Sequence, residues 1–283
     1  DVDAVAVNNN RVFLQSDFYD LFFSDNDGES WQRIWLGYNT FFSMATNGNS
    51  NIVLGGVGKI YLSTDNGNYW TKDTLPYAVV EHIAINGNDI LASSLDDSLY
   101  ISLDGGKGWK CIPILEPIHS VNINKEDFFM STWTGLYKST DFGYSWEQME
   151  IREKLIPTTV KIKDSIIVVG AWENICLSTD YGNNWDISKF PDIYISSIAI
   201  NDKIIALGCG DIYKNPDSNG VYISSDMGKN WIQKNEGIPY PHYVSSVAIE
   251  GDYLFAGTLV TQDVYGGIYR AKISDLITDV KDE

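Results

Sequence analysis

The sequence is poor in the residues from which many catalytic and metal sites are built. Its 283 residues include three cysteines, three histidines and four arginines. Three cysteines cannot all pair, so a disulfide framework is not expected. His82, His119 and His242 have no cysteine or carboxylate at ligand spacing, which indicates packed or solvent-facing imidazoles and no metal site.

Positive charge and long apolar runs are also scarce. The chain has 20 Lys and Arg against 38 Asp and Glu, a formal net charge of -18. Such a chain repels nucleic acid and anionic membrane surfaces, whereas cationic and neutral partners remain. No apolar run approaches the length of a membrane span, so membrane insertion is not expected. No phosphate-cradling glycine loop or nucleophile elbow occurs, and we predict no cofactor and no catalytic residue.

The chain instead repeats the pattern Ser-x-Asp-x-Gly-x-x-Trp five times, and a sixth copy has Asn26 in place of the aspartate. The six tryptophans are separated by 39, 39, 37, 39 and 46 residues. A period near 40 with short strands in each unit is typical of a propeller or a solenoid. The pattern comprises Ser24, Asn26, Gly28, Trp31, Ser63, Asp65, Gly67, Trp70, Ser102, Asp104, Gly106, Trp109, Ser139, Asp141, Gly143, Trp146, Ser178, Asp180, Gly182, Trp185, Ser224, Asp226, Gly228 and Trp231.

These residues can be explained by the fold alone. The serine and aspartate side chains can bond the backbone of a tight turn, and the glycine supplies a positive φ. The tryptophan then begins a strand and offers a large apolar face. We therefore predict that the repeated residues are structural and do not form binding sites.

Strand patterns within the repeat predict an all-β, seven-bladed β-propeller of four-stranded antiparallel blades. Seven first strands are expected, at residues 4–7, 42–46, 82–85, 120–123, 159–162, 197–200 and 246–249. One domain would then fill residues 1–283, with blades at about 1–36, 37–76, 77–115, 116–153, 154–191, 192–239 and 240–283. In the last blade, residues 273–280 are expected to supply the outer strand, and side-chain packing between the first and last blades is expected to close the ring.

One position of the first strands is occupied by alanine in five repeats, as expected where strands crowd around an axis. Asn122 and Lys161 depart from this pattern in the fourth and fifth repeats. They are candidates for lining a central channel, although a lysine whose ammonium group reaches solvent at the strand end is an equally good interpretation.

The period and the context Gly-x-Tyr-x-Ser-x-Asp-x-Gly-x-x-Trp, as in residues 220–231, resemble the Asp-box (BNR-repeat) propeller superfamily. That group includes sialidases, xyloglucan-degrading glycosidases, sortilin-type receptor propellers and photosystem II assembly factors. The resemblance implies the fold and not one function, because enzymes and non-enzymes share the pattern. Residues 267–280 also look like the junction that precedes a C-terminal sorting domain in secreted bacterial proteins. This likeness implies a secreted or cell-surface location. We also expect the propeller to be a monomeric domain of a larger secreted protein.

The enzymes in this superfamily need residues that can be sought in the chain. A sialidase needs three arginines that converge on the substrate carboxylate, and the four arginines here are dispersed. A glycosidase needs two carboxylates that face each other across a cleft. The sequence leaves that alternative open, with carboxylates at the channel mouth as its candidates.

The predicted site is the face opposite the repeated turns, where recognition loops of equivalent blades differ. Aromatic rings with acidic acceptors suit a glycan or a basic peptide of a protein partner. Trp133 and Trp172 are expected to stand side by side at the rim. The predicted ligand-binding residues are Trp133, Trp172, Tyr19, Tyr213, Tyr243, Tyr265, Asp96, Glu173, Asp211 and Asp263.

Overall fold

The computed structural model describes residues 2–16, 19–37, 39–152, 155–190, 192–210, 216–259 and 266–277. These residues form short antiparallel strands, a 3-10 turn η1 (Pro216–Ser218) and one short helix, α1 (Ile273–Ile277). The prediction of an all-β fold is confirmed. No helix in this part of the chain is long and apolar enough to cross a membrane.

The strands form six hydrogen-bonded sheets. The first contains β1 (Val2–Asn8), β2 (Arg11–Ser16), β3 (Asp20–Ser24) and β4 (Gln32–Ile34). The second contains β5 (Phe41–Thr46), β6 (Ile52–Ser63), β7 (Thr71–Asn86), β8 (Asp89–Ser94), β9 (Ser98–Ser102) and β10 (Lys110–Pro113). The third contains β11 (Ile118–Asn124), β12 (Asp127–Thr132), β13 (Gly135–Ser139) and β14 (Glu147–Gln148).

The remaining three sheets follow in chain order. The fourth contains β15 (Pro157–Lys163), β16 (Ile166–Ala171), β17 (Asn174–Ser178) and β18 (Asp186–Lys189). The fifth contains β19 (Ile195–Ile200), β20 (Ile205–Cys209), β21 (Gly220–Ser224) and β22 (Ile232–Gln233). The sixth contains β23 (Val244–Glu250), β24 (Tyr253–Thr258) and β25 (Ile268–Lys272).

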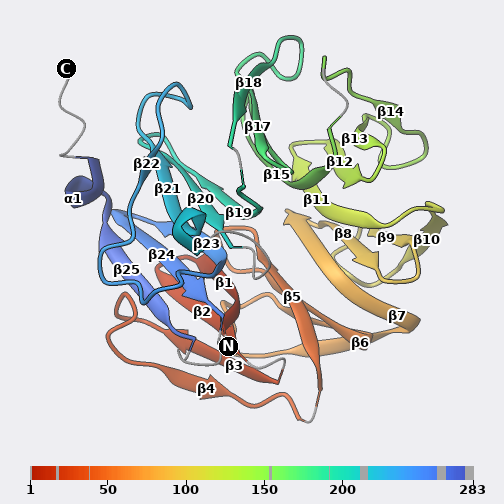
Figure 1. The fold of residues 1–283 in the computed structure, drawn as a ribbon. Coiled ribbons are helices and arrows are strands. Elements are labelled where there is room, and N and C mark those ends of the chain that lie inside the picture. The colour runs from red at the N-terminus through yellow and green to blue at the C-terminus, as the bar shows by residue number, and fades with distance from the viewer. Residues whose placement is uncertain are drawn as a thin grey trace.

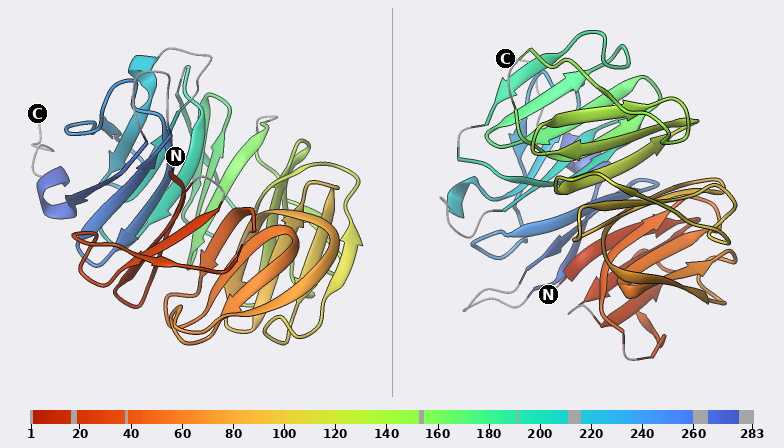
Figure 2. Two further views of the ribbon diagram at one scale, coloured as in Figure 1. Left: turned by 90° about the horizontal axis from the view of Figure 1, so that it is seen from below. Right: turned by 90° about the vertical axis from the view of Figure 1, so that its right-hand side faces the viewer.

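The sheets stand around a central channel, with the first and last sheets side by side (Figures 1 and 2). The channel is lined by β1, β5, β7, β11, β15, β19 and β23, and each of these inner strands contacts the next. Buried clusters of Val, Ile, Leu and Phe fill the spaces between neighbouring sheets. The core is therefore divided into wedges, and burial of their apolar surface holds the ring together.

The prediction of seven separate blades is wrong, because the structure has six sheets. The second and third repeats share the six-stranded sheet, in which β7 pairs with β6 through residues 71–74 and with β8 through residues 80–86. A further pair between Val57 and Val79 joins the two repeats. Gly58 in β6 and Tyr77 in β7 have positive φ, and each marks a point where two predicted strands run together.

Glycines in second strands let the neighbouring sheet approach closely. A Cβ added to Gly170 in β16 would lie 2.8 Å from a methyl group of Ile195, the first residue of β19. A Cβ on Gly257 in β24 would lie 2.5 Å from a methyl group of Val2 in β1. These contacts are shorter than packed carbon atoms tolerate, so a side chain at either position would push adjacent sheets apart.

The six repeated turns bond their own backbone. In each, the serine hydroxyl donates to the Asp or Asn side-chain oxygen at 2.8–2.9 Å and accepts from the glycine N–H at 2.7–2.9 Å. The glycine φ lies between +80° and +92° in all six. These bonds satisfy the turn within itself, in the way expected of a structural device.

Hydrogen bonds to the turn aspartates also affect their titration. The backbone N–H of Ser145, together with the hydroxyl groups of Ser145 and Ser139, lowers the pKa of Asp141 to about 2. Because the folded pKa is depressed, the stabilising effect is present above the ordinary pKa of an aspartate and is lost as the pH falls towards 2.

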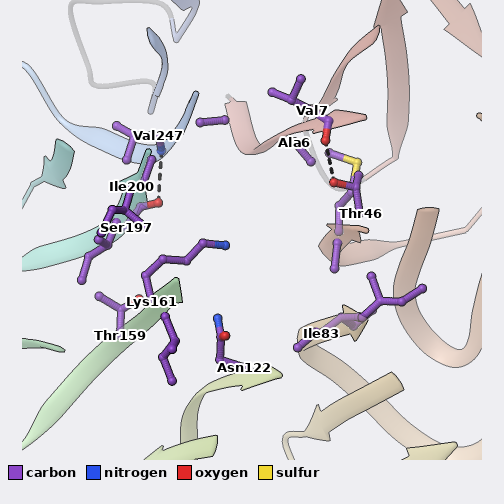
Figure 3. A pocket seen from close by; sticks show the side chains of 18 of the residues that line it. Ala6, Val7, Thr46, Ile83, Asn122, Thr159, Lys161, Ser197, Ile200 and Val247 are labelled. Atoms are coloured by element: carbon purple, nitrogen blue, oxygen red, sulfur yellow. Dashed lines mark hydrogen bonds between the residues drawn. The ribbon is translucent and has the colours of Figure 1, made fainter. Parts of the chain in front are cut away.

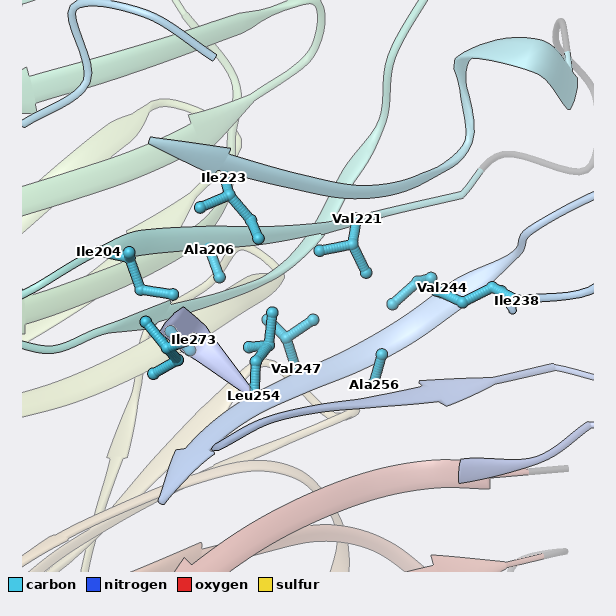
Figure 4. Packing of buried hydrophobic residues seen from close by; sticks show 11 residues of the cluster. Ile204, Ala206, Val221, Ile223, Ile238, Val244, Val247, Leu254, Ala256 and Ile273 are labelled. Atoms are coloured by element: carbon cyan, nitrogen blue, oxygen red, sulfur yellow. The ribbon is translucent and has the colours of Figure 1, made fainter. Parts of the chain in front are cut away.

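The last sheet departs from the prediction. It has three strands, and residues 273–277 form α1 where part of an outer strand was expected; residues 278–280 lie outside the described residues. Ile273 belongs to the buried cluster between the last two sheets (Figure 4). Leu276 and Ile277 pack against this cluster. Beside the helix lies a cavity of about 330 Å³ lined by residues that include Ile238, Tyr269 and Leu276. The helix covers part of the space beside β25.

Replacing Ile273 with alanine should therefore lower the free energy of unfolding by about 2 kcal/mol, because it removes a fully buried side chain beside an existing cavity. Chemical denaturation of the variant measures the loss. The exposed Ser274→Ala provides a matched control in the same helix and should stay within about 0.5 kcal/mol of wild type. Equal stability of Ile273→Ala and wild type would contradict this assignment of α1.

Closure of the ring by side-chain packing is confirmed. Val2 and Val5 of β1 share a buried cluster with Phe255 of β24. The backbone N–H of Val5 donates to Oγ of Ser246 at 3.1 Å. Across the same seam, the guanidinium group of Arg270 donates to the carbonyl oxygen of Asp27.

Candidate functional site

The two faces of the ring differ in the side chains that they expose. We call the face with the repeated turns the turn face, and the opposite face, which carries the connections from second to third strands and from one repeat to the next, the loop face. In the described chain, the exposed large hydrophobic residues on the turn face are Tyr69, Leu103, Phe142, Tyr144 and Met227. Twice as many lie on the loop face: Tyr19, Trp35, Val57, Tyr77, Leu95, Leu115, Trp133, Ile156, Trp172 and Tyr240. Exposed apolar surface is therefore concentrated on the loop face, as at many interaction sites.

Trp133 follows β12 and is 53% exposed. Its ring meets the imidazole of His119 edge to face, with centroids 4.9 Å apart. Nδ1 of His119 in turn lies 2.7 Å from the carbonyl oxygen of Pro157 in the next sheet. The imidazole is thus fixed between two sheets, and it supports one edge of the indole while the rest of the ring faces solvent.

Trp172 occupies the equivalent position after β16 and is 49% exposed. Its ring meets Tyr194 edge to face, with centroids 6.1 Å apart. Its carbonyl oxygen accepts from the side-chain amide of Asn174 at 2.9 Å. Adjacent sheets therefore each present a supported, half-exposed tryptophan on the loop face.

A third aromatic position lies at the first sheet. Tyr19, Arg33 and Trp35 line a depression of about 450 Å³ together with Asp20 and Gly37. The guanidinium carbon of Arg33 lies 4.8 Å from the centroid of the Trp35 ring, and Arg33 also forms an ion pair with Asp20. Such a stacked arginine keeps the indole in place.

The other predicted site residues differ in exposure, and four of them lie outside the described residues. Asp96 is exposed in the turn between β8 and β9, while Glu173 and Tyr243 are half-buried. Tyr213, Tyr265, Asp211 and Asp263 lie outside the described residues.

Sequence reasoning missed Trp35 and His119 as parts of this face. Trp35 falls at the end of the first predicted blade, at about residues 1–36, but an aromatic residue in a connection from one repeat to the next lies on the loop face by topology. His119 supports Trp133 from a strand that is one before it in the sheet. The spacing of residues along the sequence does not indicate a contact between side chains of two different strands.

Two groups on β7 have altered titration. Burial raises the pKa of Glu81, and the carboxylate of Asp97 raises it further. Burial and, to a lesser extent, the charge of the neighbouring His119 lower the pKa of His82 to about 4. His82 is therefore neutral at pH 7, and Glu81 holds its proton to a higher pH than an ordinary glutamate.

The arginines do not form an anion-binding triad. Arg11 pairs with Asp25, Arg33 with Asp20, and Arg270 lies 3.6 Å from Glu29. Arg11 and Arg33 are thus each held by a carboxylate of their own sheet, whereas Arg270 lies beside a carboxylate of the first sheet, across the seam. Within the described ranges, no group of three His, Cys, Asp or Glu side chains could hold a metal ion.

The central channel is a further concave feature, with a volume of about 480 Å³. Lys161 and Asn122, which were candidates for its lining, both line it (Figure 3).

Solved structures establish the architecture. A structure of YCF48 bound to D1 peptide is 14% identical, with a TM-score of 0.71 over 90% of this chain and 89% of that chain. The chain is a β-propeller. The GH74 xyloglucanase from Xanthomonas campestris is 15% identical to this propeller, with a TM-score of 0.75. The match covers 97% of this propeller and 52% of the xyloglucanase chain.

A third similar structure is the extracellular domain of the putative one component system BT4673 from B. thetaiotaomicron. It is 14% identical, with a TM-score of 0.71 over 94% of this propeller and 38% of that chain. No protein-family model matches the sequence, and no curated protein matches it. At these identities the likeness concerns the fold alone.

Proposed function

We propose that the propeller is a non-catalytic binding module of the Asp-box superfamily, which recognises a glycan or a protein partner through the loop face. The observation that carries the proposal is the concentration of exposed aromatic and aliphatic side chains on that face. Trp133 and Trp172 would be its anchors, because a rigid indole fixed along one edge loses little conformational freedom when it binds.

The chemistry of the face suits either kind of partner. Half-exposed indoles can stack on sugar rings or cover apolar side chains of a peptide, and neighbouring carboxylates can accept hydrogen bonds or pair with Lys and Arg. The net charge of -18 favours neutral or basic partners. YCF48, whose fold is similar, has a structure with a bound D1 peptide.

The proposal also concerns where the propeller works. The similar BT4673 propeller belongs to an extracellular domain. We propose an extracytoplasmic location, secreted or at the cell surface of a bacterium, with residues 1–283 as one monomeric domain of a larger protein. The resemblance of residues 267–280 to the junction before a sorting domain supports this reading.

A glycan and peptide array should identify the partner, and a double variant should test the site. Trp133→Ala with Trp172→Ala is expected to weaken binding at least about tenfold, because two stacking surfaces are lost from the centre of the contact. Titration calorimetry measures the affinity. The matched control is Tyr69→Ala with Tyr144→Ala, which removes two aromatic rings, 70% and 74% exposed, from the turn face.

The control should bind like wild type, and both double variants should keep the wild-type melting temperature within a few degrees. Normal binding by the Trp133 and Trp172 variant would exclude these anchors. An equal loss in the turn-face control would show that the partner binds elsewhere.

A second candidate function is that of a carbohydrate-active enzyme. The carboxyl group of Glu81, whose pKa is raised by burial and by Asp97, is of the kind that acts as a general acid. The similar fold of the GH74 xyloglucanase is consistent with it. Release of reducing sugars from xyloglucan by the wild-type protein, lost in Glu81→Gln, would favour this candidate over a binding module.

A further inference from the structure

Among the described residues, the lining of the central channel has one charged side chain, that of Lys161, and no carboxylate. The rest of this described lining consists of Val, Ile, Ala, Met, Ser, Thr and Asn residues of the seven inner strands, together with Gly48. This composition is unexpected in a protein with 38 acidic residues and 20 basic ones. A cation inside the channel would therefore meet a positive charge and no acidic ligand.

Lys161 and Asn122 reach the channel because of the positions that they occupy. They lie on the neighbouring strands β15 and β11, at the place where five other inner strands carry alanine. The small alanine side chains leave the middle of the channel open, and both polar side chains extend into that space (Figure 3). The ammonium group of Lys161 and the amide of Asn122 thus face the same volume from adjacent sheets.

The side chains of Lys161 and Asn122 have no polar partner within the described part of the protein. No hydrogen bond or ion pair joins Nζ of Lys161 or the side-chain amide of Asn122 to another described residue. Lys161 is accessible to solvent in the channel, and desolvation by the channel walls lowers the pKa of its ammonium group. A cationic group inside a channel gains more from a bound anion than a lysine on the outer surface does, because low-dielectric walls focus its field.

We propose that the channel binds a small oxyanion, a carboxylate or a phosphate group, between the ammonium of Lys161 and the amide of Asn122. Both side chains donate hydrogen bonds, and the ammonium group supplies the opposite charge. The channel volume of about 480 Å³ leaves room for a small molecule attached to such a group. The site is separate from the loop-face anchors and does not depend on the proposed function.

The site can be tested by titrating the purified protein with sodium phosphate and, separately, with sodium acetate. Sodium chloride keeps the ionic strength at about 0.15 M, where the long-range field of the net negative charge is screened beyond about 8 Å. Calorimetry and the melting temperature report binding, since a ligand that binds the folded state raises the melting temperature with concentration. Phosphate and acetate distinguish the two sources of the oxyanion.

The wild type should bind at least one of the two anions, and Lys161→Met should bind that anion at least about tenfold more weakly because its charged donor is gone. Lys161→Gln provides a second neutral variant, and Asn122→Ala should cause a smaller loss. Lys163→Met is the matched control, because Lys163 lies on the same strand but pairs with Asp202 outside the channel. The control should bind like wild type.

Three outcomes would overturn the proposal. They are a wild type that binds neither anion, unchanged binding in both Lys161 variants, and an equal loss in Lys163→Met. Binding of phosphate, acetate or both that is weakened in the Lys161 variants and kept in Lys163→Met supports it and identifies the oxyanion.

Discussion

Replacing Phe128 with alanine is expected to lower the free energy of unfolding by about 4 kcal/mol. Phe128 lies in β12 with none of its surface exposed, and it belongs to the cluster that also contains Leu99, Ile101 and Val121. Its ring meets Phe142 edge to face at 6.0 Å. Removal of the ring would leave a cavity between two sheets, and the strands on either side cannot close it without breaking their pairing.

Urea denaturation of the wild type and the variant measures this loss. Tyr69→Ala is a suitable control, because it also removes an aromatic ring but from a side chain that is 70% exposed. We expect the control to stay within about 0.5 kcal/mol of wild type. A loss below about 1 kcal/mol in Phe128→Ala would mean that the wedge between these sheets is loosely packed.

Trp109→Ala should have the second largest effect, a loss of about 3 kcal/mol. Trp109 is half-buried and packs against the cluster of Val53, Ile60 and Val80. Its indole N–H donates to the carbonyl oxygen of Gly106 at 3.2 Å, so the variant loses both apolar contact and a bond within the repeated turn. Partial exposure of the ring keeps the expected loss below that for Phe128.

The loss in Trp109→Ala should appear as a lower melting temperature with unchanged partner binding. Trp35→Ala is the matched control, because it removes an indole that is 55% exposed on the loop face. We expect this control to destabilise the protein by less than about 1 kcal/mol. If Trp109→Ala melted like wild type but lost its partner, the repeated turns would be binding sites and not structural devices.

Much of the architecture could be predicted because each repeat contains short patterns whose residues act on their own backbone. The serine, aspartate and glycine of each turn act on their own backbone, so a short pattern is enough to locate the connection between third and fourth strands. The alternation of small and β-branched residues then locates the inner strands.

The errors arose where one repeat departs from the others. The spacing of Ile273, Leu276 and Ile277 matches one face of a helix, but the expectation of a fourth strand in every repeat outweighed this signal. Similarly, the short connection through Tyr77 lets two strands run together as β7, and no residue type marks that event. The prediction was wrong at these positions because it assumed that every repeat has the same strands.

The site was less predictable than the fold. The exposure of Trp133 and Trp172 follows from their places after second strands, and topology alone assigns those places to the loop face. Of their supports, His119 comes from β11 and Tyr194 from the connection that precedes β19. Neither contact could be read from spacing, because each depends on how the chain turns in three dimensions.

The contact between β1 and β23 has a consequence for the number of repeats. In a linear repeat array the two terminal units must carry polar capping surfaces, since each has a neighbour on one side only. Here Val5 and Phe255 lie in one buried cluster, so the first and last sheets cap each other with apolar faces. Deletion of any one unit would uncover two such faces, and insertion of one would prevent them from meeting. The count of units in this chain is therefore fixed by the curvature of the ring, whereas a solenoid can gain or lose a unit without penalty at its ends.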